Sequence, residues 1–324
     1  MKKISIIIPV YNEEANLPAL YEALRPLIDN QMTDRQYDWE VIMINDGSRD
    51  RSSEILASLR ERDPRIVDVN LSRNFGKENA MAAGFDMVTG DAAVIMDADL
   101  QHPVDTIPRM VAEWEAGWQD VYGLRTDRST DSRMKRKLTG IYYRLLQRCT
   151  RMDVLADAGD FRLLDRQCIR ALRSLRESQR NTKALYSWIG FKKKHVEFTY
   201  GKRQGGTSSF SFGRLLTLAI DGITGFTTAP LRFASVLGIL TSTGAILYLI
   251  YILIKTLIYG DPVAGFPTLI CTILFLGGIQ LLAIGIIGEY IGRIFHETKN
   301  QPLYIIDTIS GLPESGEPNR AKRQ

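Results

Sequence analysis

The chain is poor in cysteine and histidine, and it has no strong excess of one charge. Its 324 residues include three histidines and three scattered cysteines, Cys149, Cys168 and Cys271. This odd number excludes a complete disulfide framework, no CxxC metal site is present, and the pattern suits a reducing compartment. The net charge of +4 does not require a polyanionic partner, so we expect no nucleic acid to bind.

The first residues do not show the pattern expected of a secretory signal peptide. The first apolar run, Ile4–Val10, is too short for the hydrophobic region of such a signal, and Pro9 interrupts it. We therefore expect the polar part of the chain to stay on the side of the membrane where it is made.

Two long uncharged runs stand out near the C-terminus, Phe233–Ile254 and Gly265–Gly288. As helices, each would extend roughly 30–36 Å, which matches the hydrocarbon thickness of a bilayer. Arg232 precedes the first run, and Arg293 and Lys299 follow the second, so the positive-inside rule places both termini in the cytoplasm. The alternative is a buried hairpin within a large soluble domain, but the runs favour a two-helix transmembrane hairpin.

The first 130 residues alternate between short apolar runs and amphipathic segments. This rhythm predicts a doubly wound, mostly parallel α/β sheet whose ligands bind at the carboxyl ends of the strands. The predicted strands are Ser5–Val10, Glu40–Ile44, Ile66–Leu71 and Ala92–Met96, and the predicted helices are Glu13–Ile28, Ser52–Arg62 and Lys77–Val88.

Two basic or amphipathic segments, 132–151 and 210–230, precede the long apolar runs. Either could be an ordinary surface helix packed on the sheet. A basic amphipathic helix just before a membrane span is also typical of a helix that lies in the bilayer interface, where anionic lipid would attract it.

The clearest chemical signal is Asp97-Ala98-Asp99 at the end of a predicted strand. Two carboxylates in this arrangement can reach one Mg²⁺ or Mn²⁺ ion, and such ions often bridge to substrate phosphates. A plain turn would also favour aspartate here.

Polar loops follow the first two predicted strands as well. Tyr11 and Glu13 lie after the first strand and Asp46 after the second, where a nucleotide base and ribose would bind in such a sheet. Each loop alone could be ordinary turn chemistry, but together they place carboxylates at one edge.

These segments resemble, in order, the motifs of family 2 glycosyltransferases with the GT-A fold, and most closely those of the polyprenyl-phosphate glycosyltransferases, such as bactoprenol glucosyltransferases and dolichol-phosphate mannose synthases. The resemblance extends from Ile4 to about Tyr304. It is carried by Pro9–Glu14, Asn45–Ser48, Arg73–Lys77, Asp97–Pro103, Gly123–Arg125, Gly159–Leu163 and Gly288–Arg293.

The resemblance implies a role for each matching residue. The expected donor contacts are Pro9, Tyr11, Glu13, Asp46, Lys77, Asp97 and Asp99, and the expected metal ligands are Asp97, Asp99 and Gln101. Asp160 matches the proposed catalytic base, with Arg162 beside it. The groups expected to hold the acceptor phosphate are Arg125, Arg128, Arg136, Lys137 and Arg203. Relatives often carry lysine where this chain has Ser209, which leaves the role of loop 203–211 open.

The implied reaction is an inverting, metal-dependent transfer of a hexose, glucose from UDP-glucose above all, onto undecaprenyl phosphate, in the modification of cell-surface glycans such as O-antigen. One alternative keeps the reaction but transfers aminoarabinose or mannose. Two others are a non-catalytic scaffold and a processive polysaccharide synthase. Because a phosphate monoester is largely a dianion at neutral pH, we expect Asp160 to orient the acceptor more than to deprotonate it.

The resemblance also implies a multi-pass protein of the bacterial inner membrane. It further implies a homo-oligomer, for which a tetramer is the expected form. The expected organisation is a cytoplasmic catalytic domain (1–209, with the interfacial helix 132–151), a second interfacial helix (210–230), two transmembrane helices (231–258 and 265–292) and a cytoplasmic C-terminal segment (293–324).

Overall fold

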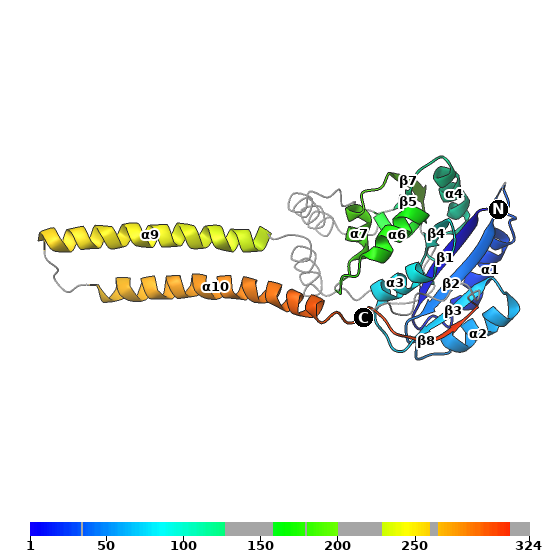
Figure 1. Cartoon of the computed structure of the whole chain (residues 1–324), viewed down its shortest axis with the longest axis horizontal. Coiled ribbons are helices and arrows are strands. Elements are labelled where there is room, and N and C mark those ends of the chain that lie inside the picture. Colours follow the sequence, from blue (N-terminus) through cyan, green and yellow to red (C-terminus); the bar gives the residue numbers. More distant parts are fainter. Residues whose placement is uncertain (34, 127–157, 179, 200–228, 260–264, 312–324) are drawn as a thin grey trace. The chain divides into compact units, whose positions relative to one another are not determined.

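The computed structural model describes residues 1–33, 35–126, 158–178, 180–199, 229–259 and 265–311 (Figure 1). These residues belong to two compact units. We call residues 1–199 with 301–311 the sheet domain, and residues 229–300 the hairpin. The two predicted amphipathic helices lie almost entirely outside the described residues.

The sheet domain contains one sheet, which comprises eight strands among the described residues, in the order β7-β5-β6-β4-β1-β2-β3-β8 (Figure 1). The strands are β1 (Lys3–Val10), β2 (Asp38–Asn45), β3 (Ile66–Leu71), β4 (Ala92–Ile95), β5 (Asp120–Arg125), β6 (Ala158–Asp165), β7 (Lys193–Phe198) and β8 (Ile306–Ser310). β6 runs antiparallel to β4 and β5, and β8 runs antiparallel to β3, whereas the other neighbouring strands are parallel. The predicted mostly parallel α/β sheet is therefore confirmed.

Helices cover this sheet on both sides, as the doubly wound pattern requires. They are α1 (Leu17–Ile28), α2 (Ser52–Arg62), α3 (Lys77–Met87), the short η1 (Val104–Thr106), α4 (Ile107–Glu115), α6 (Arg166–Ser174) and α7 (Thr182–Trp188). α1 contacts α2 and η1, while α3 contacts α6 and packs on β1 and β2.

The residues of the central strand β1 explain why it lies buried between two layers of helices. Its isoleucines are fully buried because apolar side chains cover both faces of the strand. Ile6 belongs to the main core cluster. Ile7 packs against α3 at Gly84, where an added Cβ would lie 2.4 Å from Ile7 Cγ2. The approach of α3 to β1 therefore depends on a glycine, and this approach positions the start of α3.

The structure shifts predicted boundaries, most of all the start of the first helix, and adds strands that the sequence did not reveal. The first helix begins at Leu17, not at Glu13, because Asn12 has a φ of 55° and a turn precedes Pro18 in the first helical turn. The β5 to β7 half of the sheet and β8 carried no clear alternating pattern. β8 forms after the hairpin and enters the sheet beside β3.

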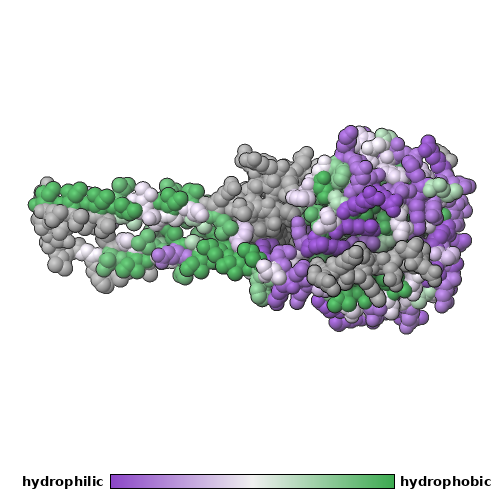
Figure 2. All heavy atoms as spheres, viewed as in Figure 1, coloured by the Kyte–Doolittle hydropathy of each residue, from purple (hydrophilic) through white to green (hydrophobic). Residues whose placement is uncertain are grey.

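The hairpin consists of α9 (Ala229–Tyr259) and α10 (Phe266–Thr298), which lie side by side. Among the described residues, Phe275–Thr298 is one helical stretch long and apolar enough to cross a membrane, with a mean hydropathy of 1.6, and Phe233–Tyr248 is a shorter apolar stretch. Figure 2 shows a largely hydrophobic surface along both helices, in contrast to the mainly hydrophilic visible face of the sheet domain.

Candidate functional site

Hydrogen bonds join the loop after β1 to the loop after β2. Ser48 Oγ accepts from the Asn12 amide at 3.0 Å, Ser52 Oγ accepts from the Glu13 amide at 2.9 Å, and Asn12 Oδ1 accepts from the Arg49 amide at 2.8 Å. Because β1 and β2 are parallel, both loops leave the same edge of the sheet. The polar residues of the two loops are thereby fixed as one surface.

Asp46 organises a third loop at this edge. Its side chain is buried, and its two oxygens accept from the Phe75 amide at 2.7 Å and the Gly76 amide at 2.9 Å. Burial raises the pKa of Asp46, while these two hydrogen bonds lower it. The neighbouring Gly47 has a φ of 66°, and a Cβ there would lie 2.5 Å from the Arg73 carbonyl carbon. Close contact between these loops thus requires glycine.

The three loops and the end of β4 surround a cavity of about 420 Å³. All seven residues predicted to contact the donor line this cavity: Pro9, Tyr11, Glu13, Asp46, Lys77, Asp97 and Asp99. Val10, Asn74, Gly76, Ala80 and Ala98 complete its lining. The structure therefore brings the predicted donor residues together, and their individual roles stay predictions.

The turn that carries Asp97 and Asp99 has an unusual backbone. Leu100 has a φ of 61°, a conformation that leucine rarely adopts. Asp99 Oδ1 accepts from the Gln101 amide at 3.1 Å, and His102 Nδ1 accepts from the Asp97 amide at 3.0 Å. His102 is buried and stacks on Phe161 with ring centroids 4.7 Å apart, which gives it a structural role. Strain of this kind is often retained where a side chain must be held for function.

Lys77, the first residue of α3, joins two carboxylates from neighbouring strands. Its Nζ lies 2.7 Å from Asp97 Oδ1, just beyond β4, and 2.8 Å from Asp160 Oδ2 on β6. Burial would raise the pKa of Asp160, but the charges of Lys77 and Lys183 outweigh it and hold that pKa below its ordinary value of 3.8. Asp160 is therefore an anion at neutral pH, and its side chain is only 11% exposed.

Arg162 lies deeper than Asp160 and has different partners. Its guanidinium donates to both oxygens of Asp120 at 3.1 and 3.0 Å, and to the Gly159 carbonyl at 3.0 Å. The same group lies over the ring of Tyr186, 3.7 Å from its centroid. Arg162 is almost fully buried and does not line the cavity. These contacts hold the guanidinium in place, and its predicted catalytic role stays a prediction.

The acidic residues of the cavity fit a divalent ion in charge and in donor type. Burial raises the pKa of Glu13, and the nearby charges of Asp99 and Asp97 raise it further, so three carboxylates gather here. Among the described residues, no group of three or more His, Cys, Asp and Glu side chains is arranged to hold a metal. Sites for Mg²⁺ commonly combine one or two carboxylates with substrate phosphates and water, and Asp97 and Asp99 are the residues predicted to provide those carboxylates.

The residues predicted to hold an acceptor phosphate are mostly outside this description. Arg128, Arg136, Lys137 and Arg203 lie outside the described residues. Arg125 is the last residue of β5 and is half-buried beside Phe198 of β7; it does not line the cavity.

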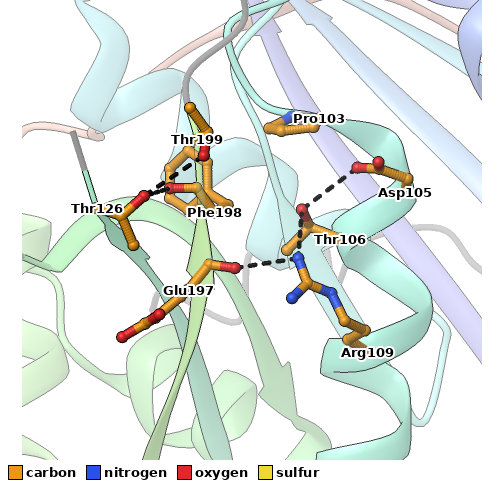
Figure 3. Close-up of a pocket in the computed structure, with 8 residues that line it drawn as sticks. All are labelled: Pro103, Asp105, Thr106, Arg109, Thr126, Glu197, Phe198 and Thr199. Carbon is orange, nitrogen blue, oxygen red and sulfur yellow. Dashed lines mark hydrogen bonds between the residues drawn. The ribbon is translucent and has the colours of Figure 1, made fainter.

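A second hollow, of about 480 Å³, lies where β5 and β7 end (Figure 3). Arg109 Nη2 donates to the Glu197 carbonyl at 3.0 Å, and Thr126 Oγ1 donates to the Phe198 carbonyl at 3.2 Å. The predicted donor residues do not line this hollow. Contacts between η1, α4 and the two strand ends hold its walls together, so we assign these contacts a role in the fold.

Comparison with known proteins decides the family. The profile described as "Glycosyl transferase family 2" matches residues 5–173, which is more than half of the chain. The chain belongs to glycosyl transferase family 2. A second profile, "GtrB C-terminal hairpin", matches residues 229–294. Together with the apolar stretch of α10, this match indicates association with a membrane.

The curated relatives of this family 2 glycosyltransferase match over nearly their whole length. The chain is 41% identical to a bactoprenol glucosyl transferase of Shigella phage SfX over 94% of this chain and 98% of the relative. It is 40% identical to a prophage bactoprenol glucosyl transferase homolog of Escherichia coli K12, over 95% and 99%. A crystal structure of glucosyl-3-phosphoglycerate synthase from Mycobacterium tuberculosis is more distant, with 20% identity, a TM-score of 0.45, and coverage of 69% and 78%.

Sequence reasoning missed some residues of this glycosyltransferase site. Lys183, at the start of α7, contributes positive charge to Asp160, and Glu78 accepts from the Thr182 amide at 2.8 Å. No local pattern marks these residues, since α7 reaches the site only through the tertiary fold. Asn74 and Gly76 were detectable, because they stand in the motif that contains Lys77.

Proposed function

We propose that this glycosyltransferase moves glucose from UDP-glucose onto undecaprenyl phosphate, with inversion at the anomeric carbon. The observation that carries the proposal is the cavity of about 420 Å³ at the carboxyl edge of the sheet, which gathers Asp97, Asp99 and Lys77 beside the loops expected to bind the nucleotide. The names of the curated relatives support the choice of sugar and of lipid acceptor.

A divalent ion, Mg²⁺ or Mn²⁺, held by Asp97 and Asp99 with Gln101 beside them, would neutralise the diphosphate that leaves with the bonding electrons. In the reaction, an acceptor phosphate oxygen forms a bond to the anomeric carbon. The bond from that carbon to the donor's β-phosphate oxygen breaks, and its electron pair goes to the departing UDP.

The main task of the residues around Asp160 is to stabilise negative charge, and proton transfer contributes little. The second pKa of a phosphate monoester is about 6, so the acceptor needs little deprotonation at neutral pH. Lys77 and Lys183 reduce the repulsion between the Asp160 carboxylate and an arriving phosphate. Asp160 Oδ1 is buried and has no hydrogen-bond partner among the described residues, so the carboxylate acts on the reactants through its charge and its contact with Lys77. Asp160 thus orients the reactants.

We place the hairpin across the bacterial inner membrane, with the sheet domain and both termini in the cytoplasm. α9 has 31 residues and α10 has 33. At about 1.5 Å per residue, each helix is longer than the roughly 30 Å hydrocarbon layer. The basic residues Arg232, Arg293 and Lys299 stand near the ends that the proposal assigns to the cytoplasm.

A homo-oligomer, a tetramer by resemblance, is part of the proposal. Gly277, Gly278, Gly285 and Gly288 lie on α10, and no described atom outside their own helix turn lies within 4 Å of the position that a Cβ would take at any of them. Small residues of this kind allow helices to approach closely in a membrane.

The test is transfer by the purified full chain in vesicles that contain undecaprenyl phosphate. We expect a sugar-lipid product from UDP-glucose with Mg²⁺ or Mn²⁺, and none after the ion is chelated. Donors that carry mannose or aminoarabinose are compared under the same conditions. Product from one of these alone would replace glucose as the sugar, and no binding of any nucleotide in the presence of Mn²⁺ would favour a non-catalytic scaffold.

A further inference from the structure

Lys77 forms an ion pair with Asp97, one of the two aspartates that the proposed metal ion needs. The ammonium group lies 2.7 Å from Asp97 Oδ1 and 2.8 Å from Asp160 Oδ2, so it links the predicted metal site to the carboxylate on β6. Asp97 is 29% exposed and Lys77 is 42% exposed, so both side chains can be reached from the cavity. Asp160, at 11%, is far less accessible.

An ammonium group and a divalent cation at the same carboxylate repel each other. Such repulsion is stronger in a partly buried site than in water, because the effective dielectric constant is lower. Asp99 and Glu13 stand close by and supply negative charge that favours a cation at this place in either case. The two cations therefore compete for Asp97.

We propose that Lys77 is a built-in counter-ion for Asp97 which the metal ion displaces when the donor binds. It neutralises the acidic cluster in the empty enzyme, leaves Asp97 as the ion arrives, and keeps its contact with Asp160. Lys77 is in this sense a positioning residue that couples the donor half of the site to the acceptor half. This inference rests on the proposed metal-dependent function.

The backbone around Lys77 is fixed on both sides, so the exchange requires movement of the side chain alone. Asp46 accepts from the amides of Phe75 and Gly76, just before the helix. Glu78 accepts from the amide of Thr182, and its carboxylate also contacts the Thr182 hydroxyl. A four-carbon side chain can rotate away from Asp97 while its other partner, Asp160, stays within reach.

Because coupling between two bound groups is reciprocal, removing the ammonium should strengthen metal binding in the absence of donor. We expect Lys77→Met to bind Mn²⁺ at least about fivefold more tightly than the wild type, which is the lower end of typical coupling between sites. A merely structural defect would weaken metal binding, so the direction of the change separates the two explanations.

The experiment is a titration of the detergent-solubilised full chain with Mn²⁺, followed by electron paramagnetic resonance of the free ion, without nucleotide and then with UDP. Lys77→Arg keeps the charge and should retain an affinity close to that of the wild type. Lys183→Met is the matched control, because Lys183 is exposed and acts on Asp160 without a contact to Asp97; we expect it to change the affinity by less than about twofold.

If Lys77→Met does not fold, as judged by its thermal unfolding, Lys77→Gln carries the same expectation. Equal or weaker Mn²⁺ binding by the neutral variant, with normal binding by the wild type in the presence of UDP, would overturn the inference and leave the proposed function intact. Absence of Mn²⁺ binding in every variant, with and without UDP, would overturn the metal-dependent function and this inference together.

Discussion

The sheet domain and the hairpin place the same kinds of apolar side chain in opposite surroundings. In β1 the isoleucines at positions 4, 6, 7 and 8 are all 0% exposed. On the hairpin, Leu240 is 66% exposed and Leu281 is 72% exposed. Burial of apolar surface contributes about 25 cal/mol per Å². The sheet domain obtains this contribution from its own core, whereas the hairpin must obtain it from its surroundings, which is what a bilayer or further helices would provide.

The largest expected effect tests whether the chemistry belongs to the sheet domain. Asp97→Ala or Asp99→Ala should lower transfer by roughly 10³-fold or more, because each removes a carboxylate proposed to hold the ion that stabilises the leaving diphosphate. The measurement is the initial rate of sugar-lipid formation in vesicles. Glu54→Ala is the control, since Glu54 is an exposed acid on α2. Substantial metal-dependent activity in either variant at the site would contradict the assignment.

The next prediction concerns the interior of the sheet domain, where a charge without a partner cannot be tolerated. The side chains of Arg162 and Asp120 are 3% and 0% exposed. Asp120→Asn should lower the free energy of unfolding by about 3–5 kcal/mol, because it leaves the Arg162 charge buried without its carboxylate. Arg25→Met, at the exposed pair of Arg25 with Glu22 on α1, should cost less than about 1 kcal/mol. Urea unfolding followed by tryptophan fluorescence measures both, and equal costs would contradict the distinction.

A charged residue introduced on the hairpin tests whether lipid or water surrounds its helices. Leu281→Asp should oppose membrane insertion by about 2.5–3.5 kcal/mol, the cost of aspartate at the centre of a spanning helix. The fraction of protein in washed membranes should fall accordingly. Ile305→Asp is the matched control, since Ile305 is 53% exposed but belongs to the sheet domain. Equal behaviour of the two variants would mean that water surrounds both side chains.

The smallest expected effect is a pH dependence. The pKa of Asp160 lies below its ordinary value of 3.8, so its carboxylate is lost only as the pH falls through that lowered value. The stabilising contact with Lys77 is therefore fully present above about pH 4. Asp160→Asn should then reduce the rate by a similar factor at about pH 5.5 and at about pH 8. A much smaller loss at the higher pH would instead support a role as a base.

The sequence predicts the first half of the sheet better than the second, for a physical reason. β1 to β4 are buried on both faces and alternate with helices, so each appears as a short apolar run. β6 carries Asp160 and Arg162, and β7 begins with lysines, so polar partners obscure the pattern of these strands. β8 pairs with β3 only after the chain returns from the hairpin, and no local pattern predicts so distant a partner.

The candidate site shows the same limit. Residues on strand-end loops could be predicted because parallel strands bring their carboxyl ends to one edge, and the resemblance identified them by position. The pairing of Lys77 with Asp160 could not, because these residues are separated by 83 positions in the chain. The pairing of Arg162 with Asp120 was missed for the same reason, since both are charged residues of strands that a pattern of apolar residues cannot align.

The return of the chain to β3 has a consequence for any shortened form of the protein. β8 occupies the outer hydrogen-bonding edge of β3, and Tyr304 just before it donates to Asp86 at 2.6 Å. Ending the chain after α10 would leave β3, with the sequence IVDVNL, as an edge strand whose outward amides and carbonyls lack partners. Such a fragment should self-associate through the exposed edge of β3, so β8 also protects the protein from aggregation.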